Sequence, residues 1–264
     1  MATTMVNEML EQKIANTFGK SCQSYDGSAR LQRLSGQKIL PMLTKQHSFN
    51  VLDLGCGTGY FTEIMARQFD RVSGVDLSRQ MLEFAKIHRQ PDIDFYQADM
   101  HHLPVYNETY DSVFSNLAVQ WSYDLTALFT EVHRVLKPGG TFVFTTLLDG
   151  TLCELERAWQ HVDNDKHVLD FLQFDDLNQC VLQSAFDVKH LEKQAIVLPY
   201  NSVKHLAQEL KALGASHVPG KQNKGLASRR RWQAMSTVYE QLCQDNIVAT
   251  YQLCCVKLIK PLTC

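Results

Sequence analysis

The feature that most constrains this chain is a short apolar segment that runs directly into three alternating glycines, Val-Leu-Asp-Leu-Gly-Cys-Gly-Thr-Gly at 51–59. Glycine has no Cβ, so the backbone at Gly55, Gly57 and Gly59 can pass close beneath a bound ligand. Residues 60–69 have helical character, and the free N–H groups at the start of that helix would face the same space. A strand, a glycine turn and a helix in this order predict a ligand site at the end of a sheet strand.

The spacing of the glycines separates two classes of ligand. A dinucleotide fingerprint, G-x-G-x-x-G, needs its third glycine at position 60, which is Tyr60 in this chain. An acidic residue, Asp53, lies two residues before the first glycine. This D-x-G-x-G-x-G pattern resembles motif I of the class I S-adenosylmethionine (SAM) methyltransferases. The resemblance implies that the turn contacts SAM through Asp53, Gly55, Cys56, Gly57 and Gly59.

Strand-like and helix-like segments alternate between residues 50 and 148. The strand-like runs are 51–54, 72–75, 93–96, 112–115 and 141–146, and the helix-like runs are 60–69, 78–88 and 125–136. Lys-Pro-Gly-Gly at 137–140 is expected to stop a helix and turn into the next strand. Alternation of this kind predicts a parallel sheet with helices on both faces.

The rest of the chain adds two late strands and several helices. The strands are expected at 188–199 and 246–259, and the helices at 13–43, 153–162, 171–182, 203–213 and 228–244. The expected fold class is α/β, the class I methyltransferase (Rossmann-like) three-layer sandwich with a seven-stranded, mostly parallel sheet and helical cap or insertions. We expect a single methyltransferase domain over 1–264, built from a helical segment at 1–46, a SAM-binding core at 47–148, and substrate-side helical elements at 149–185 and 201–245.

Acidic and amide side chains follow the next strands of the predicted sheet. Asp76 ends the second strand, where its carboxylate can accept both hydroxyl protons of an adenosine ribose; the alternative is a helix N-cap, a role that Ser78 already suits. Asp99 ends the third strand and can accept the adenine amino proton, or else form a simple turn. Asn116, at the end of the fourth, is placed next to the sulfonium by analogy with motif IV. The other expected contacts with SAM are apolar: Leu77, Met81 (which could equally belong to the core), Met100 and Leu117.

Composition argues against several classes of partner. The net charge of −2 over 264 residues implies no global attraction to nucleic acid or membrane. No stretch of about 18 apolar residues occurs, and residues 1–13 lack the apolar run of a signal peptide. The eight cysteines show neither a C-x-x-C pair nor metal-ligand spacing. We therefore expect no metal, and free thiols in a reducing cytoplasm.

Beyond motif I the resemblance narrows to one family. Residues 115–121, Ser-Asn-Leu-Ala-Val-Gln-Trp, resemble the motif IV region of the malonyl-acyl-carrier-protein O-methyltransferases of biotin synthesis. Segments at 14–33, 144–163 and 213–226 also resemble that family. The resemblance implies transfer of the SAM methyl group to the free carboxylate of a malonyl thioester, which primes pimeloyl synthesis. That carboxylate is already ionised at pH 7, so no catalytic general base is expected.

Such a site needs a cation or several donors to hold the carboxylate. The candidates are Lys20, Arg33, Arg157 and His217, with Tyr25 and Trp121 as closing walls. Each cation has an ordinary alternative, since Arg33 and Arg157 could simply line solvated helix faces.

Between Glu209 and Glu240 the sequence is basic and contains no Asp or Glu. Acyl carrier proteins are strongly acidic, so the family resemblance implies a local basic face that would steer such a partner. Its expected residues are Lys221, Lys224, Arg229, Arg230 and Arg231. The same cluster would suit RNA, or could be a solvated helix face. No RNA-binding module is recognisable, so we expect neither nucleic acid nor membrane as a partner.

Three other functions are compatible with parts of the pattern. They are a SAM-dependent methyltransferase for another small acceptor or for tRNA, a protein that binds SAM without turnover, and a nicotinamide enzyme. Tyr60 and the alternating glycines argue against the last of these.

Overall fold

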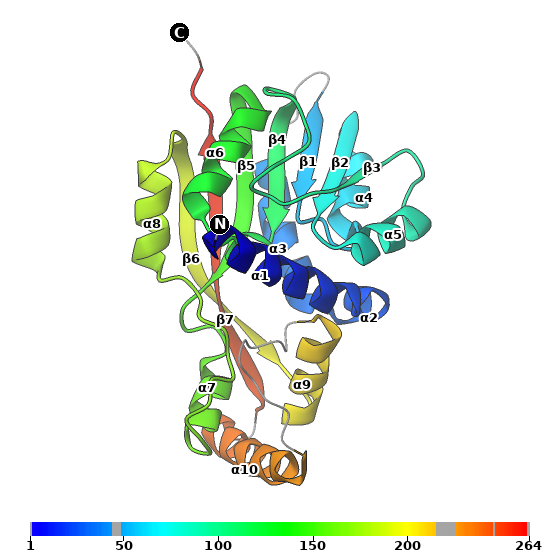
Figure 1. Cartoon of the computed structure of the whole chain (residues 1–264). Helices are drawn as coiled ribbons and strands as arrows, with labels where there is room; N and C mark the ends of the chain where they lie inside the picture. The colour runs from blue at the N-terminus through cyan, green and yellow to red at the C-terminus, as the bar shows by residue number, and fades with distance from the viewer. Residues whose placement is uncertain (1, 44–48, 215–224, 245, 263–264) are drawn as a thin grey trace.

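A seven-stranded sheet forms the centre of the molecule (Figure 1). The computed structural model describes residues 2–43, 49–214, 225–244 and 246–262, and the side chains of α1 and α10 from residues 11 and 229 onward. The strand order is β3-β2-β1-β4-β5-β7-β6, and β7 runs antiparallel to both of its neighbours while the other pairs are parallel. The strands are β1 (Asn50–Leu54), β2 (Arg71–Asp76), β3 (Asp94–Gln97), β4 (Tyr110–Asn116), β5 (Leu136–Leu148), β6 (Asp187–Pro199) and β7 (Val248–Ile259). The mostly parallel sheet predicted from the sequence is confirmed.

Helices cover both faces of this sheet and extend beyond one end of it. Their bounds are α1 (Ala2–Gly19), α2 (Cys22–Ser28), α3 (Arg30–Ile39), α4 (Tyr60–Ala66), α5 (Arg79–His88), α6 (Leu125–Val135), α7 (Cys153–Gln160), α8 (Phe174–Gln183), α9 (Val203–Ala212) and α10 (Gly225–Cys243), with short 3-10 turns η1 (Leu40–Met42) and η2 (Val119–Trp121). Figure 1 shows α7, α9 and α10 gathered at the lower end of β6 and β7, where α7 and α9 both pack on α10. No helix among the described residues is long and apolar enough to span a membrane.

Alternate residues of the strands feed two separate hydrophobic clusters, because successive side chains of a strand point to opposite faces. On β4, Phe114 packs into the cluster that contains α3 and α4, whereas Val113 joins the cluster that contains α6 and α8. On β7, Cys255 belongs to the first of these clusters and Cys254 to the second. Both faces are therefore buried, which is why these strands are continuous apolar runs in the sequence.

The sequence predicts that residues 137–140 end a helix and turn into the next strand, but these residues already belong to β5, which begins at Leu136 directly after α6. Tyr110 pairs with Leu136 and Ser112 pairs with Thr141, so the intervening residues of β5 form a bulge. Their backbone is not left unpaired, because the Gly139 N–H donates to the carbonyl of Lys260 at 2.9 Å. Hydrogen bonds to the segment after β7 keep these residues in the sheet.

The strand order reverses at β1, which lies between β2 and β4. Sheets of this kind bind ligands in the crevice outside the carboxyl ends of the strands at such a switch point. The glycine turn follows β1 at this position, and α1 and α2 pass in front of it in Figure 1.

Candidate active site

Three neighbouring cavities lie near the carboxyl ends of the strands, and the glycine turn lines two of them. A middle cavity of about 90 Å³ lies between α1 and the carboxyl ends of β1, β2 and β4. A small cavity of about 50 Å³ lies between the turn and helices α2, α3 and α4. A large cavity of about 280 Å³ is lined mainly by apolar side chains, many of them from α3, α7, α9 and α10. Tyr25 lines all three cavities, and Phe18, Leu117 and Trp121 line both the large and the middle one.

The glycine turn adopts a backbone conformation that other residues avoid. The φ angles are +76° at Gly55, +53° at Gly57 and +75° at Gly59, all in the left-handed region. A Cβ at Gly55 would lie 2.3 Å from the Cβ of Ala118, so the turn packs directly on the segment after β4. A Cβ at Gly57 would meet no atom within 4 Å, and Gly57 lines both the middle and the small cavity. The space beside Gly57 is thus open to a ligand.

Asp76 lies in the middle cavity and holds the glycine turn. Its carboxylate accepts the backbone N–H of Gly57 and the backbone N–H of Ser78, both at 2.8 Å. Burial raises the pKa of this carboxyl, and the backbone donors oppose the shift. Each oxygen keeps a second lone pair, so both can still accept a hydrogen bond from a ligand. The N-cap of α5 is Ser78, whose hydroxyl accepts from Met81 N–H at 3.4 Å.

Asp99 lines the same cavity and is oriented by two ring systems. The His101 ring contacts its carboxylate at 2.7 Å (Nδ1 to Oδ1), and the hydroxyl of Tyr123 donates to Oδ2 at 3.4 Å. Burial by itself would raise the pKa of Asp99, but the hydrogen bonds from the side chain and backbone of His101 lower it to about 2. The other ring nitrogen of His101 contacts Ser122 Oγ at 2.8 Å, which fixes the imidazole. Asp99 is therefore an ionised acceptor of fixed orientation.

The apolar residues predicted to contact the cofactor do line the middle cavity. They are Leu77, Met81, Met100 and Leu117. Met81 is also almost completely buried, so it belongs to the core and to the cavity wall together. Leu117 has a φ of +53°, and its N–H donates to Thr145 Oγ1 at 2.9 Å. Its strained backbone places it on the wall that separates the middle cavity from the large one.

Asp53, Cys56 and Arg33 line the small cavity. The Asp53 carboxylate is buried and accepts from Thr62 Oγ1 at 2.6 Å, which joins β1 to α4. Burial raises the pKa of Asp53 to about 7, with a further contribution from the charge of Asp76. Burial also holds the pKa of the Cys56 thiol well above its usual range. The guanidinium of Arg33 lies 5.4 Å from the centre of the Tyr60 ring, on the side of the glycine turn rather than of the large cavity.

The Asn116 side chain fastens α3 to the sheet. Its Oδ1 accepts from Ser35 Oγ at 2.7 Å and from Thr145 Oγ1 at 2.8 Å, and its Nδ2 donates to the carbonyl of Gln32 at 2.9 Å. Asn116 does line the middle and small cavities, but both polar atoms of its amide are engaged with protein partners. The structure therefore gives Asn116 a positioning role beside the predicted sulfonium site.

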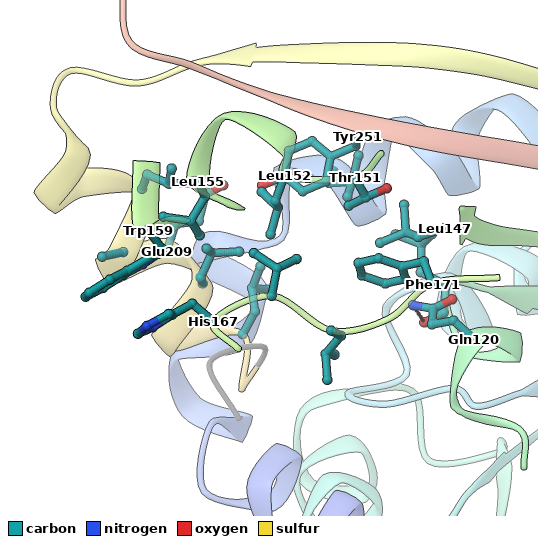
Figure 2. Close-up of a pocket in the computed structure, with 18 of the residues that line it drawn as sticks. Gln120, Leu147, Thr151, Leu152, Leu155, Trp159, His167, Phe171, Glu209 and Tyr251 are labelled. Carbon is teal, nitrogen blue, oxygen red and sulfur yellow. Dashed lines mark hydrogen bonds between the residues drawn. The ribbon is translucent and has the colours of Figure 1, made fainter. Parts of the chain in front are cut away.

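The large cavity is elongated, with Gln120, Leu147 and Phe171 at one end and Trp159, His167 and Glu209 toward the other (Figure 2). Its walls are mainly Leu, Val, Phe and Trp side chains.

The six residues predicted to hold the acceptor do not share one place. Tyr25 and Trp121 line the large cavity, as a closing wall would. Lys20 and Arg157 are exposed and line none of the three cavities. Arg33 is in the small cavity, and His217 lies outside the described residues.

The predicted basic face is divided as well. Arg229 and Arg230 are exposed, whereas Lys221 and Lys224 lie outside the described residues. Arg231 instead lines the large cavity, where its guanidinium is ion-paired with Asp163 and, at 2.6 Å, with Asp165. One carboxylate oxygen from each of these two residues and one ring nitrogen of His167 lie within 4.8 Å of one another. The guanidinium of Arg231 is the positive charge beside the two carboxylates.

Sequence reasoning missed several polar groups of these cavities. They are Gln32, Gln120, His101, Glu209 and Tyr251. Gln120 lies inside the Ser-Asn-Leu-Ala-Val-Gln-Trp segment, so that segment was its available signal. Gln32 lies in the family-like segment 14–33, and His101 follows Asp99 by two residues. Glu209 and Tyr251 have no local signature, because only the fold brings them to the large cavity.

Comparison with known proteins shows which family the chain is related to. Residues 52–144, from the middle of β1 to Phe144 in β5, match the methyltransferase domain family. The malonyl-acyl-carrier-protein O-methyltransferase of Yersinia pestis is 37% identical over 230 residues, which cover 87% of this chain and 84% of that protein. This chain belongs to the malonyl-acyl-carrier-protein O-methyltransferase family. The family resemblance drawn from the sequence is thereby confirmed.

A second relative from this family is longer. The biotin biosynthesis bifunctional protein BioHC of Cellvibrio japonicus is 36% identical over 260 residues, which are 98% of this chain but 52% of that protein. The chain thus spans about half the length of this bifunctional relative.

The fold of the family is also seen in solved structures. Geranyl diphosphate C-methyltransferase of Streptomyces coelicolor A3(2), solved with S-adenosyl-L-homocysteine bound, superposes with a TM-score of 0.54 at 16% identity. The match covers 88% of this chain and 80% of that one. At this identity the likeness shows the class I methyltransferase fold.

Proposed function

We propose that this protein transfers the methyl group of SAM to the free carboxylate of a malonyl thioester carried by acyl carrier protein. The observation that carries the proposal is the shared wall of Phe18, Tyr25, Leu117 and Trp121 between the middle and the large cavity. A cofactor on one side of this wall and an acceptor on the other would meet beside Tyr25 and Leu117. Membership of the family supports this acceptor among the possible ones.

The residues of the middle cavity fit the adenosine part of SAM. Asp76 keeps free lone pairs for the two ribose hydroxyls, and the ionised Asp99 can accept the adenine amino group. Leu77 and Met100 supply apolar walls for the ring. The open space beside Gly57 lets the ligand continue into the small cavity. Bound SAM supplies an electrophilic methyl group on a sulfonium.

The small cavity suits the amino-acid part of SAM. We assign Arg33 to the carboxylate of that part, because Arg33 is a cation that lines this cavity beside the glycine turn. In this proposal Arg33 binds the cofactor and does not anchor the malonyl group. The guanidinium also donates to the carbonyl of Asp26, which holds it near the turn.

The acceptor carboxylate needs orientation and loss of water more than it needs a base. An ordinary carboxyl group is ionised at neutral pH and is itself the nucleophile. Burial raises the pKa of Tyr25 well above its usual value, with further contributions from Asp76 and Asp26, so its hydroxyl stays protonated and can donate to the carboxylate. Apolar walls exclude water around the reacting oxygen, and positioning of the two reactants accounts for much of such a rate enhancement.

We place the contact with the carrier protein at Arg229 and Arg230 of α10. Arg229 and Arg230 are exposed there, next to Arg231 on the wall of the large cavity. An acidic partner that docks at this position could reach the cavity with its thioester arm. Arg231 belongs to the cavity wall in this arrangement, because its guanidinium is already paired with two carboxylates.

The decisive experiment incubates the pure protein with SAM and malonyl-acyl carrier protein, malonyl-CoA or free malonate. Formation of a methyl ester on the carrier-bound thioester, detected by mass spectrometry, is the expected result. A Tyr25→Phe variant should lower kcat with little change in affinity for S-adenosyl-L-homocysteine, because it removes one donor and keeps the ring. Absence of methyl ester on every acceptor would refute the proposal.

A further inference from the structure

Two unpaired amide oxygens line the large cavity. In the described part of the chain, four buried side-chain atoms have no hydrogen-bond partner, and Gln32 Oε1 and Gln120 Oε1 are two of them. Both glutamines line the large cavity, and Gln32 also lines the small one. A buried carbonyl oxygen without a donor is unfavourable, so such an atom in a cavity wall indicates a donor on the ligand.

The amide of Gln120 is held in a defined orientation. Gln120 lies in η2, which begins three residues after the end of β4, and its Nε2 donates to the carbonyl of Leu117 at 2.8 Å. Turning the amide over would lose this bond, so the oxygen is the atom that remains for a ligand. Leu117 and Trp121, on either side of Gln120 in the chain, both line the middle cavity too. Gln120 thus lies at the end of the large cavity that is next to the methyl donor.

The opposite part of the cavity also offers an acceptor. Glu209 is buried, and its carboxylate accepts from Arg30 Nε at 2.9 Å and from the hydroxyl of Tyr200 at 2.8 Å. Figure 2 shows Glu209 well separated from Gln120 along the cavity. A plain acyl chain would leave the Gln120 oxygen without a donor, and an anionic group beside the Glu209 carboxylate would be repelled. An arm with amide N–H groups matches both the acceptors and the apolar walls.

We propose that Gln120 is a specificity-determining residue, whose amide oxygen accepts a hydrogen bond from an amide N–H on the arm of the thioester acceptor. This inference rests on the proposed function, because it needs a thioester whose carboxylate lies at the wall shared with the middle cavity. Gln120 then selects acceptors by their arm and leaves the reacting carboxylate to Tyr25.

The test compares two small malonyl thioesters that differ in one group. One is the thioester of N-acetylcysteamine, and the other has an ester oxygen in place of its amide N–H. Their dissociation constants are measured by calorimetry with S-adenosyl-L-homocysteine present, so that no turnover occurs. The wild-type protein should bind the amide form about tenfold more tightly, the factor expected for one net hydrogen bond. In Gln120→Met the two forms should bind equally, and the affinity for the ester form should not change.

A second variant separates ligand recognition from a structural role. Gln120→Glu keeps an oxygen acceptor but loses the N–H that bonds Leu117, so recognition predicts that the preference for the amide survives. A loss of preference in both variants would show that the bond to Leu117 is what matters, and would overturn the inference. A preference retained in Gln120→Met would overturn it as well.

Gln32→Met is the matched control, because it removes the other unpaired oxygen. It should keep the preference for the amide form, and loss of the preference in this variant alone would move the role to Gln32 and overturn the assignment. The same two thioesters, supplied with SAM and assayed by mass spectrometry, test the proposed function independently. A protein that prefers the amide form but yields no methyl ester would refute the methyl transfer and not the recognition of the arm.

Discussion

Gly57→Ala should separate cofactor binding from stability. The residue has a φ of +53°, so an alanine would be strained by about 1 kcal/mol. Its Cβ would touch no protein atom within 4 Å and would enter the space shared by the middle and small cavities. In the proposed position of SAM, the Cβ that Gly57→Ala adds would collide with the ligand. We expect affinity for S-adenosyl-L-homocysteine to fall at least tenfold, about 1.4 kcal/mol, while the free energy of unfolding falls only by the strain.

Gly55→Ala is the matched control, because its φ of +76° imposes a similar strain. Its Cβ would lie 2.3 Å from the Cβ of Ala118, so the turn or the segment after β4 must move. Overpacking of this kind costs about 1–3 kcal/mol in addition to the strain. Gly55→Ala should therefore lose more stability than Gly57→Ala, whereas Gly57→Ala should lose more affinity for S-adenosyl-L-homocysteine.

Urea denaturation followed by circular dichroism measures the stability of each variant, and calorimetry measures its affinity for S-adenosyl-L-homocysteine. The result that would refute the reasoning is a Gly57→Ala protein that binds this ligand as tightly as the wild type. The ligand would then not pass beside Gly57, and the assignment of the three cavities would be wrong.

Four further outcomes are expected. Asp76→Ala should weaken binding of S-adenosyl-L-homocysteine at least tenfold through loss of two charge-assisted hydrogen bonds, and an unchanged dissociation constant in calorimetry would remove the ribose assignment. Asn116→Ala breaks two hydrogen bonds between α3 and the sheet and one between β4 and β5, and should lower the free energy of unfolding by about 3 kcal/mol; a change within about 0.5 kcal/mol in urea titrations would contradict its positioning role. The folded-state pKa of Asp53, about 7, lies above the unfolded value, so the folded state binds the extra proton and stability should fall as pH rises between about 4 and 7; Asp53→Asn should remove this slope, and an identical slope in the variant would exclude Asp53 as its source. Changing Arg229 and Arg230 together to Glu should lower kcat/KM for malonyl-acyl carrier protein far more than for malonyl-N-acetylcysteamine, whereas equal losses would place the carrier contact elsewhere.

Much of the cofactor side of the site could be predicted from the sequence. The glycine turn, Asp76 and Asp99 each follow a strand directly, and parallel strands bring their carboxyl ends to one edge of the sheet. Local sequence therefore carries most of the information about this edge. The conformation of Gly57 and the apolar walls at Leu77 and Met100 follow from the same local pattern.

The acceptor side could not be predicted in this way, because its residues are brought together from distant parts of the chain. The sequence predicts Arg231 on a basic face for the carrier protein, but carboxylates 66 and 68 residues earlier in the chain hold its guanidinium against the large cavity. The sequence predicts that Asn116 contacts the cofactor, and it gives no sign that Ser35, 81 residues away, donates to its amide oxygen. Periodicity and motif spacing report a residue's neighbours in the chain and not its partners across the fold. The sequence by itself thus determined the fold class, the family and the sheet edge that we propose for the methyl donor. Only the tertiary structure decided which side chains face the acceptor, because long-range packing closes the large cavity.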